Sequence, residues 1–515
     1  MDRGREGVGS EGGLSDTTAA RRHWRDRLQS TPGLLALLAF WLVCTAGLRP
    51  LLLPDEGRYA SVALEMLHGD PLVPTLNGLP FFHKPPLLYW LDMAALQVFG
   101  PTAFAARFAS LLGAWLMGAA LFLALRRWHG AGTARLALGV LATCPLFFLA
   151  AQYANHDMLV AGLISVAVLC FVRALEDAPK PALGWLVGAW AACGFALLAK
   201  GLIGIVLPAL VVGPWLIAQR RWRDLARLLH PLGLLAFVAV AGPWLAAMQS
   251  RYPGFFDYFI VEQHFRRYNQ TNFNNAHPFW FFVVVLPLLT LPWSGWLALR
   301  ASRVFAARGP MPGLLAWWVL AVIGFFSLPS SKLVGYVLPA LAPWCAMTAL
   351  AIATPPFPER RFRVVIVGAA LLCVGAVIAL AWTAPNSHRA AALALAARMA
   401  PGDKVAMVEE YFYDVPFYAR LSGPVLIASD WSDPDLPNRD NWRKELFDAA
   451  RFDPAKGRAV LWPIARLDAL SCGPHAVWFV VKAGAGAALQ RVSGAVLAYA
   501  DARTELWRAP ARPCA

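Results

Sequence analysis

Long apolar runs, separated by short polar segments, recur along the chain from residue 33 to residue 383. A helix needs about 20 mostly apolar residues to cross a bilayer, and many of these runs approach that length. We therefore predict about eleven membrane-spanning helices, and up to thirteen because hydropathy misses short or broken helices. The predicted spans lie near residues 33–52, 102–125, 133–152, 158–175, 182–199, 201–219, 231–249, 278–299, 312–329, 333–353 and 364–383.

Composition supports a membrane protein. Of the 515 residues, 58% are hydrophobic and only 15% are charged, and the mean hydropathy is +0.51. A soluble chain of this length would carry more charge to cover its surface.

Basic residues between the runs set the orientation. If the spans alternate, all these clusters fall on one side of the bilayer, which the positive-inside rule makes the cytoplasmic side. Much of the net charge of +15 is then topological, and no nucleic-acid partner is expected. The clusters contain Arg21, Arg22, Arg25, Arg27, Arg126, Arg127, Arg173, Lys180, Arg220, Arg221, Arg223, Arg227, Arg300, Arg303, Arg308, Arg360, Arg361 and Arg363.

The opposite side receives residues 53–101, two tight turns near 153–157 and 330–332, the loop 250–277, and everything after about 384. Ionisable groups beside hydrocarbon are costly, so a cluster of them marks a candidate site. The densest cluster lies in residues 54–90. Outside the cytoplasm neither ATP nor a nucleotide sugar is available, so a donor would have to arrive on a lipid.

Both ends of the chain differ from the apolar middle. Residues 1–30 are rich in Gly, Ser and Arg, and we expect a disordered cytoplasmic segment. Residues 385–515 alternate short apolar runs with helix-like stretches, which predicts a soluble α/β domain without an evident catalytic signature. A disulfide between Cys472 and Cys514 is expected there, because the outer compartment permits it. The predicted strands are Lys404–Val408, Pro424–Ala428, Ala459–Trp462 and Ala476–Val481, and the helix-like stretches are Asn441–Arg451 and Ala487–Val492.

Two residues of the first outer loop are the leading candidates. Asp55 opens a short amphipathic helix that we expect to lie along the outer membrane surface. It is either a helix cap or a functional carboxylate. Lys84 is held by Pro85 and Pro86 at the membrane surface, where it suits a lipid-linked phosphate, or else it snorkels to headgroups.

Other outer segments supply further candidates. Asp157 is a cap or a second functional acid, and Arg58 and Arg266 could clamp a phosphate. Lys332 and Tyr336 could face the same phosphate, although Lys332 could equally snorkel. The neighbours predicted to contact substrate are Glu56, Tyr59 and His156, and the pair that could share a metal, or be merely exposed, is His83 and His264. Together these residues fit a pocket for a phosphate-linked donor beside an acceptor.

The string PDEGRYASVALEML…GDPLVPTLNGLPFFHKPPLLYW resembles the first outer loop of the lipid A 4-amino-4-deoxy-L-arabinose transferases. These belong to the protein O-mannosyltransferase-like glycosyltransferases with the GT-C fold. The segments SSKLVGYVLPALAP and HFRR…HPFWFF resemble further parts of the family. The resemblance implies a transmembrane glycosyltransferase domain over 31–384, with its catalytic first periplasmic loop at 53–101, and a periplasmic domain over 385–515.

The resemblance also implies a reaction at the periplasmic face of the bacterial inner membrane. The donor would be an undecaprenyl-phosphate sugar, the acceptor lipid A, and the anomeric carbon would invert. By matching position, Asp55 is the catalytic carboxylate, Asp157 a second essential acid, and Lys84 and Tyr336 contact the donor phosphate. Arg58 and Arg266 are phosphate ligands on the same basis.

The resemblance leaves the cofactor open. The family commonly has Glu before the lysine of KPP, and a divalent metal has been associated with that Glu and a loop His. This chain has His83 there, so zinc or magnesium binding is an open expectation. Membrane lipids are the other expected partners, and a monomer is expected.

Two alternatives remain. A protein or another envelope glycan could be the acceptor, in which case Asp55 must act as general base rather than orient substrate. A transporter of lipid-linked sugars would be expected to carry its charges near the midplane of the spans, whereas here they cluster on one face.

Overall fold

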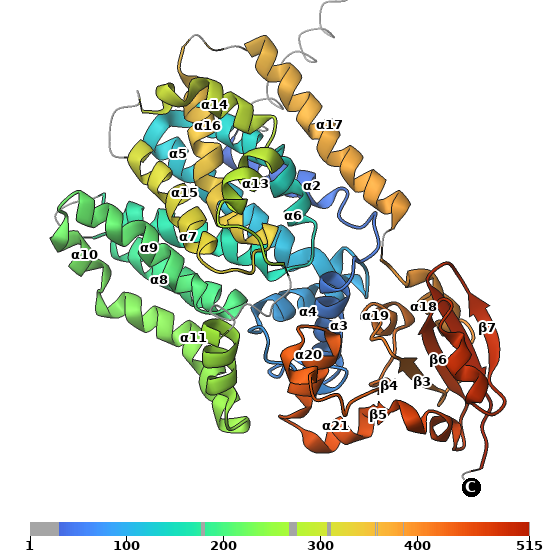
Figure 1. The fold of residues 1–515 in the computed structure, drawn as a ribbon. Helices are drawn as coiled ribbons and strands as arrows, with labels where there is room; N and C mark the ends of the chain where they lie inside the picture. Colours follow the sequence, from blue (N-terminus) through green and yellow to red (C-terminus); the bar gives the residue numbers. More distant parts are fainter. Residues whose placement is uncertain are drawn as a thin grey trace, which may run out of the picture.

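The computed structural model describes residues 30–176, 181–266, 275–305, 311–355, 357, 359–384 and 386–513, with the side chains of 264–266 left out. It contains a helical bundle and, at one end of it, a smaller domain built on a sheet (Figure 1). The segment predicted to be disordered, 1–30, lies outside the described residues except for its last position.

Every apolar run predicted as a span forms a helix or a pair of helices. Gly130 has φ +82° and breaks the 35-residue α5 close to where the second and third predicted spans part. The bundle consists of α2 Thr31–Val43, α5 Phe108–Ala142, α6 Pro145–Ala151, α7 His156–Ala174, α8 Leu183–Lys200, α9 Ile203–Ala218, α10 Trp222–Leu228, α11 Pro231–Arg251, the π-helix η2 Asp257–Arg266, α13 Phe281–Leu289, α14 Trp293–Val304, α15 Met311–Ser327, the 3₁₀ helix η3 Val334–Ala340, α16 Leu341–Ala353 and α17 Glu359–Thr383.

Within the described residues, six helices are long and apolar enough to cross a membrane. A seventh span is possible by the same measure, because α13 and α14 form one apolar unit bent by 105°. Shorter apolar helices, including α2, α9 and α15, account for other predicted spans. The protein is therefore a multi-span membrane protein, and the predicted total of about eleven spans stays a prediction.

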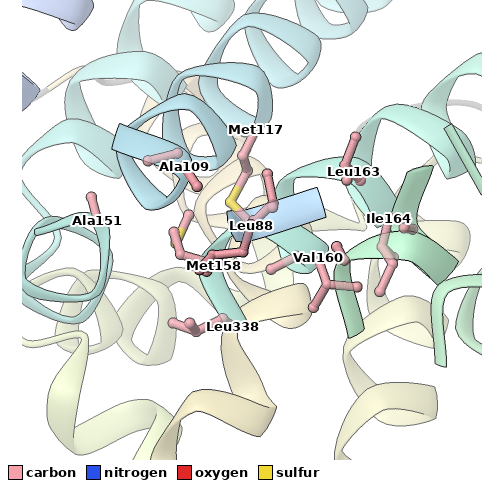
Figure 2. Packing of buried hydrophobic residues seen from close by; sticks show 14 of the residues in the cluster. Leu88, Ala109, Met117, Ala151, Met158, Val160, Leu163, Ile164 and Leu338 are labelled. Carbon is pink, nitrogen blue, oxygen red and sulfur yellow. The ribbon is translucent and has the colours of Figure 1, made fainter. Parts of the chain in front are cut away.

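The centre of the bundle is the crossing of α5 and α7. A Cβ on Gly162 would lie 2.1 Å from the carbonyl oxygen of Gly113, so only two glycines let these backbones approach so closely. Small residues permit this kind of contact in membrane helices, where packing rather than the hydrophobic effect joins helices. Figure 2 shows Met158 of α7 packed among side chains of α4 (Leu87–Phe99), α5 and η3. This crossing fixes the start of α7, where Asn155 and Asp157 lie.

The first outer loop folds as a compact unit against the bundle. It contains α3 Asp55–His68, the hairpin of β1 Thr75–Leu76 and β2 Leu79–Pro80, and α4 Leu87–Phe99; the 3₁₀ turn η1 Ala105–Arg107 follows it and leads into α5. The helix starts at the predicted residue, but the expectation that one charged face is exposed was wrong, and its location along the membrane surface stays a prediction. Most of α3, including Gly57, Ala60, Val62 and Ala63, is buried, because the C-terminal domain covers the face turned away from the bundle.

The C-terminal domain has a six-stranded mixed sheet in the order β5-β4-β3-β6-β8-β7. Strands β5, β4, β3 and β6 are parallel, and β8 and β7 are added antiparallel at one edge. The four predicted strands are confirmed, whereas β7 and β8 were not predicted. The strands are β3 Lys404–Val408, β4 Leu426–Ser429, β5 Leu461–Pro463, β6 Val477–Lys482, β7 Val496–Ala500 and β8 Thr504–Ala509.

Helices and 3₁₀ turns connect these strands. The predicted helix at 441–451 is present as α20, whereas the stretch at 487–492 forms a 3₁₀ helix. Cys472 is disulfide-bonded, and its predicted partner Cys514 lies outside the described residues. The connecting elements are α18 Arg389–Ala396, α19 Val415–Ala419, η4 Leu436–Asn438, α20 Trp442–Ala450, α21 Pro454–Val460, η5 Ile464–Arg466, η6 Asp468–Ser471 and η7 Gly486–Arg491.

Specific hydrogen bonds attach this domain to the first outer loop. The Asn77 amide donates to the Val425 carbonyl at 2.9 Å and accepts from the Val425 N–H at 2.7 Å. The Ser61 hydroxyl donates to the Tyr413 carbonyl at 2.8 Å. Each of these polar groups is buried and would be left unsatisfied if the domain moved away. The loop and the domain therefore form one body in this structure.

A buried ion-pair network holds the loop to the bundle. Glu56 is fully buried and pairs with Arg49 and with Arg107, whose Nε lies 2.8 Å from its carboxylate. The same carboxylate accepts the N–H groups of Leu52 at 2.8 Å and Ala154 at 2.9 Å. Burial alone would raise the pKa of Glu56, but the charges of Arg107 and Arg49 outweigh it and lower the pKa to about 2. Glu56 was predicted to contact substrate, and this is wrong because the carboxylate is enclosed by protein.

Replacement of Glu56 by Gln should strongly destabilise the protein, because two guanidinium groups would remain buried without their counter-charge. Breaking a buried pair in this way costs about 3–5 kcal/mol. The measurement is the melting temperature of the detergent-solubilised protein. Glu359→Gln is the control, since Glu359 and its partner Arg363 are 66% and 71% exposed and their pair should contribute little. Equal melting temperatures for the two variants would contradict the anchoring role.

Candidate active site

A cavity of about 1370 Å³ lies between the bundle, the first outer loop and the C-terminal domain. Its walls come from segments that are far apart in sequence, near residues 53–59, 81–84, 155–157, 200, 262–263, 333–336 and 410–451. Predicted site residues that line it are Asp55, Arg58, Tyr59, His83, Lys84, Asp157 and Tyr336.

Asp55 is the first residue of α3, and its side chain serves the cavity rather than the helix end. The N-cap position is held by Pro54. One carboxylate oxygen of Asp55 pairs with Arg58, and the other accepts a hydrogen bond from the Asn155 amide at 3.2 Å. The side chain remains 25% exposed. The Asp55 side chain therefore does not cap α3, and the capping alternative is wrong.

At Asp157, as at Asp55, another residue holds the N-cap position of the helix. Asn155 caps α7 by accepting the N–H of Asp157 at 3.0 Å, which frees the Asp157 carboxylate for another partner. That partner is Lys200, the last residue of α8. The ammonium group of Lys200 also lies 4.6 Å from the ring centroid of Tyr336, a cation–π contact. Asp157, Lys200 and Tyr336 thus form one cluster on the bundle side of the cavity.

Lys200 was missed by the sequence analysis. It ends an apolar run, and Gly201 after it has φ +90°, so the chain turns back at once into α9. A lysine in a tight turn between two spans on the predicted outer side was the available signal. It resembles many lysines that merely reach for lipid headgroups, and only the fold places it beside Asp157.

The wall opposite the bundle belongs to the C-terminal domain. Arg58 pairs with Asp55 and also with Glu445 of α20. Tyr413 donates its hydroxyl hydrogen to Glu445 at 2.6 Å. Burial would lower the pKa of Arg58, but the charge of Glu445, with smaller effects of Tyr59 and Asp55, raises it. None of these C-terminal residues was singled out from the sequence, because a lone Glu in an amphipathic helix carries no functional signal.

Three of the predicted site residues lie elsewhere. His156 is fully buried against the rings of Tyr59 and Tyr89, at centroid distances of 4.5 Å and 5.3 Å, so its predicted substrate contact is wrong. Lys332 is also buried, and its ammonium group donates to the carbonyls of His277 at 2.9 Å and of Pro329. Lys332 therefore closes a loop and does not line the cavity. Glu56 belongs to the buried network described above.

Of the two histidines predicted to share a metal, only His83 has a described side chain. His83 lines the cavity with its ring stacked on Phe81 at a centroid distance of 4.6 Å. The side chains of His264 and Arg266 lie outside the described residues. In the part of the chain that is described, no three His, Cys, Asp or Glu side chains gather as a metal site. These residues alone do not supply a donor set for a divalent ion, so no chemical step is assigned to one.

Comparisons with known proteins agree with the resemblance seen in the first outer loop. Residues 83–246 match the family model of the dolichyl-phosphate-mannose-protein mannosyltransferases. Undecaprenyl phosphate-alpha-4-amino-4-deoxy-L-arabinose arabinosyl transferase 2 of Sodalis glossinidius is 36% identical over 332 residues, covering 62% of this chain and 59% of that protein. The corresponding transferase of Pseudomonas aeruginosa is 34% identical over 316 residues, covering 60% of this chain and 57% of that protein. The match thus spans about three fifths of the length of these relatives.

The fold is similar to that of ArnT from Cupriavidus metallidurans. Its crystal structure bound to undecaprenyl phosphate matches with a TM-score of 0.79 and 23% identity, over 92% of this chain and 97% of that one. The apo structure matches with a TM-score of 0.78 and 22% identity, over 95% and 98% of the two chains. The predicted GT-C-type membrane fold with an additional C-terminal α/β domain is therefore confirmed.

Gly335→Ala should disturb the cavity, because the added Cβ would lie 2.0 Å from Oδ2 of Asp157. Either Asp157 or the η3 backbone must move, which strains the cluster with Lys200. We expect a lower melting temperature. The matched control is Gly324→Ala in α15, where no atom of the described residues lies within 4 Å of the new methyl group. There the loss of chain freedom in the unfolded state should slightly stabilise the protein. Similar shifts for both variants would show that the close contact is unimportant.

Proposed function

We propose that the protein is an inverting glycosyltransferase that moves 4-amino-4-deoxy-L-arabinose, or a similar amino sugar, from undecaprenyl phosphate to a phosphate of lipid A. The observation that carries the proposal is the single cavity that joins Asp55, Lys84, Asp157, Lys200 and Tyr336. The names of the relatives, and the undecaprenyl phosphate in the ArnT crystal, supply the substrate class.

The donor phosphate would lie on the membrane side of the cavity, beside Lys84 and Lys200. Lys84 follows the β1–β2 hairpin, and Lys200 ends a bundle helix, so both charges come from elements anchored in the membrane domain. When the bond between the anomeric carbon and the phosphate oxygen breaks, its electron pair stays on the leaving undecaprenyl phosphate. Fixed positive charges stabilise that developing charge. Tyr336 would support Lys200 through its ring.

The acceptor would attack from the opposite face of the sugar. A lipid A phosphate has a second pKa near 6 and is already nucleophilic at neutral pH, so no proton needs to be removed. Asp55 would then orient the sugar and the acceptor, held in place by Arg58 and Asn155. If the acceptor is instead a hydroxyl of a protein or another envelope glycan, Asp55 would have to take the proton.

The cavity would face the periplasm, and the C-terminal domain would lie there with it. This assignment rests on the arginine clusters between the helices, which the positive-inside rule puts in the cytoplasm. The cellular location would be the bacterial inner membrane, where undecaprenyl-phosphate sugars and newly made lipid A are both present.

The direct test of the function is mass spectrometry of lipid A after incubation with the purified protein and undecaprenyl-phosphate aminoarabinose. Added pentosamine on a lipid A phosphate is the expected result. Release of undecaprenyl phosphate that depends on a protein acceptor, with lipid A unchanged, would favour the other acceptor. If the sugar stays on the donor with every acceptor, the proposed enzyme activity is wrong.

Asp55→Asn and Lys84→Ala should each reduce transfer by about 10²-fold or more, through loss of the orienting carboxylate and of phosphate stabilisation respectively. The rate is measured with the same donor and with protein checked for normal folding. Asp70→Asn is the control, because Asp70 lies on the same loop but is 44% exposed and pairs with Arg251 at 2.7 Å, away from the cavity. Wild-type rates for Asp55→Asn would remove Asp55 from the mechanism.

A further inference from the structure

Arg58 joins the membrane domain to the C-terminal domain inside the cavity wall. Its guanidinium pairs on one side with Asp55 of the same helix and on the other with Glu445 of α20. The Arg58 side chain is only 13% exposed and that of Glu445 only 12%. A phosphate that binds Arg58 would have to compete with the two carboxylates that already neutralise the guanidinium charge.

Glu445 is itself held in place. Asn441 caps α20 by accepting the N–H groups of Arg443 and Lys444, which fixes the first turn of the helix where Glu445 lies. The hydroxyl of buried Tyr413 donates to the second oxygen of Glu445 at 2.6 Å. The two oxygens of Glu445 therefore have separate partners, one of them Arg58.

Two aromatic rings limit the motion of the guanidinium. The Arg58 Cζ lies 5.0 Å from the ring centroid of Tyr59 and 5.6 Å from that of Tyr413, both within cation–π range. One ring comes from the membrane domain and the other from the C-terminal domain. Arg58 is thus held from both sides, and its remaining function is to hold Asp55.

Misplacement of a reacting group by about 1 Å can lower a rate by about 10²-fold. Among the described residues, the Asp55 carboxylate has two polar side-chain partners, Arg58 and Asn155. Without Glu445, Arg58 would retain one carboxylate partner and could follow it or turn toward the donor phosphate. The exact position of the Asp55 carboxylate therefore depends on Glu445, which lies 390 positions later in the chain.

We propose that Glu445 and Tyr413 are positioning residues for the transfer, acting through Arg58 on Asp55, so that the C-terminal domain completes the active centre. The inference rests on the proposed function and deepens it. It changes the role of Arg58, which the sequence analysis assigned to the donor phosphate, to the alignment of Asp55. The donor phosphate is left to Lys84 and Lys200.

Glu445→Gln tests the proposal with little change in shape. The amide can still accept from Tyr413, but the charge that holds Arg58 is lost. We expect kcat for aminoarabinose transfer to fall about 10- to 100-fold, while KM for the undecaprenyl-phosphate sugar stays within about twofold, because the phosphate-binding lysines are untouched. Tyr413→Phe should give a smaller loss of kcat with the same pattern.

The matched control disturbs the same domain interface without touching Arg58. Asn77 makes two hydrogen bonds to Val425 and has φ +55°. Asn77→Gly removes these side-chain hydrogen bonds, and glycine adopts this backbone conformation without strain. It should lower the melting temperature and leave kcat nearly unchanged. If Glu445→Gln keeps the wild-type kcat, or if kcat falls equally in both variants, Glu445 only attaches the domain and the proposal is wrong.

A second measurement separates this inference from the proposed function, because it needs no transfer. Asp55→Asn and Glu445→Gln each leave Arg58 one full charge partner, whereas the double variant leaves a buried guanidinium with none, which is far more destabilising. The melting temperature of the double variant should therefore fall by more than the sum of the two single shifts. Additive shifts would overturn the coupling through Arg58, whereas a wild-type protein that fails to transfer sugar would overturn only the proposed function.

Discussion

The buried carboxylate of Glu56 is the contact on which the placement of the cavity depends. It joins Arg49, which follows the first bundle helix, Arg107, which precedes α5, and the backbone of Ala154, which precedes α7. Three separate segments of the membrane domain thus converge on one side chain next to Asp55. Glu56 and its two arginine partners are enclosed by protein. Moving any of these segments would therefore leave an unpaired charge in surroundings that cannot solvate it. The first outer loop is consequently fixed on the bundle at the point where Asn155 and Asp157 enter the cavity.

The C-terminal domain closes the structure from the other side. It buries the outer face of α3 and supplies about half of the cavity wall, including Tyr413 and Glu445. Both parts of the wall carry charges of both signs. The membrane side carries Lys84 and Lys200, which suit a phosphate, together with the carboxylates of Asp55 and Asp157. The C-terminal domain adds further acids and bases, among them Glu445 and Lys444.

The sequence and the structure differ most instructively at two neighbouring residues. Asp55 and Glu56 are adjacent acids in the same loop, and both were assigned to the site. Along α3 they point in different directions, so Asp55 reaches the cavity, whereas Glu56 reaches into the bundle between two arginines. The same separation applies to His156 and Asp157, of which only Asp157 reaches the cavity and Lys200. Residue type and neighbourhood select the segment, but the direction of each side chain depends on what packs around the helix.

The sequence by itself determined the helical membrane architecture, the apolar runs that become helices, four strands of the C-terminal domain and the choice of Asp55 and Lys84 as candidates, both of which line the cavity. These are local properties, since hydropathy, periodicity and a dense charged segment can be read within a few tens of residues. Only the tertiary structure decided that α3 is covered on both faces, that Lys200 meets Asp157, and that Glu445 meets Arg58 across 387 positions. Such pairings have no local signature, because a charge in a turn or on an amphipathic helix is equally stable in water. When such a charge is buried at a domain interface, it requires an oppositely charged partner.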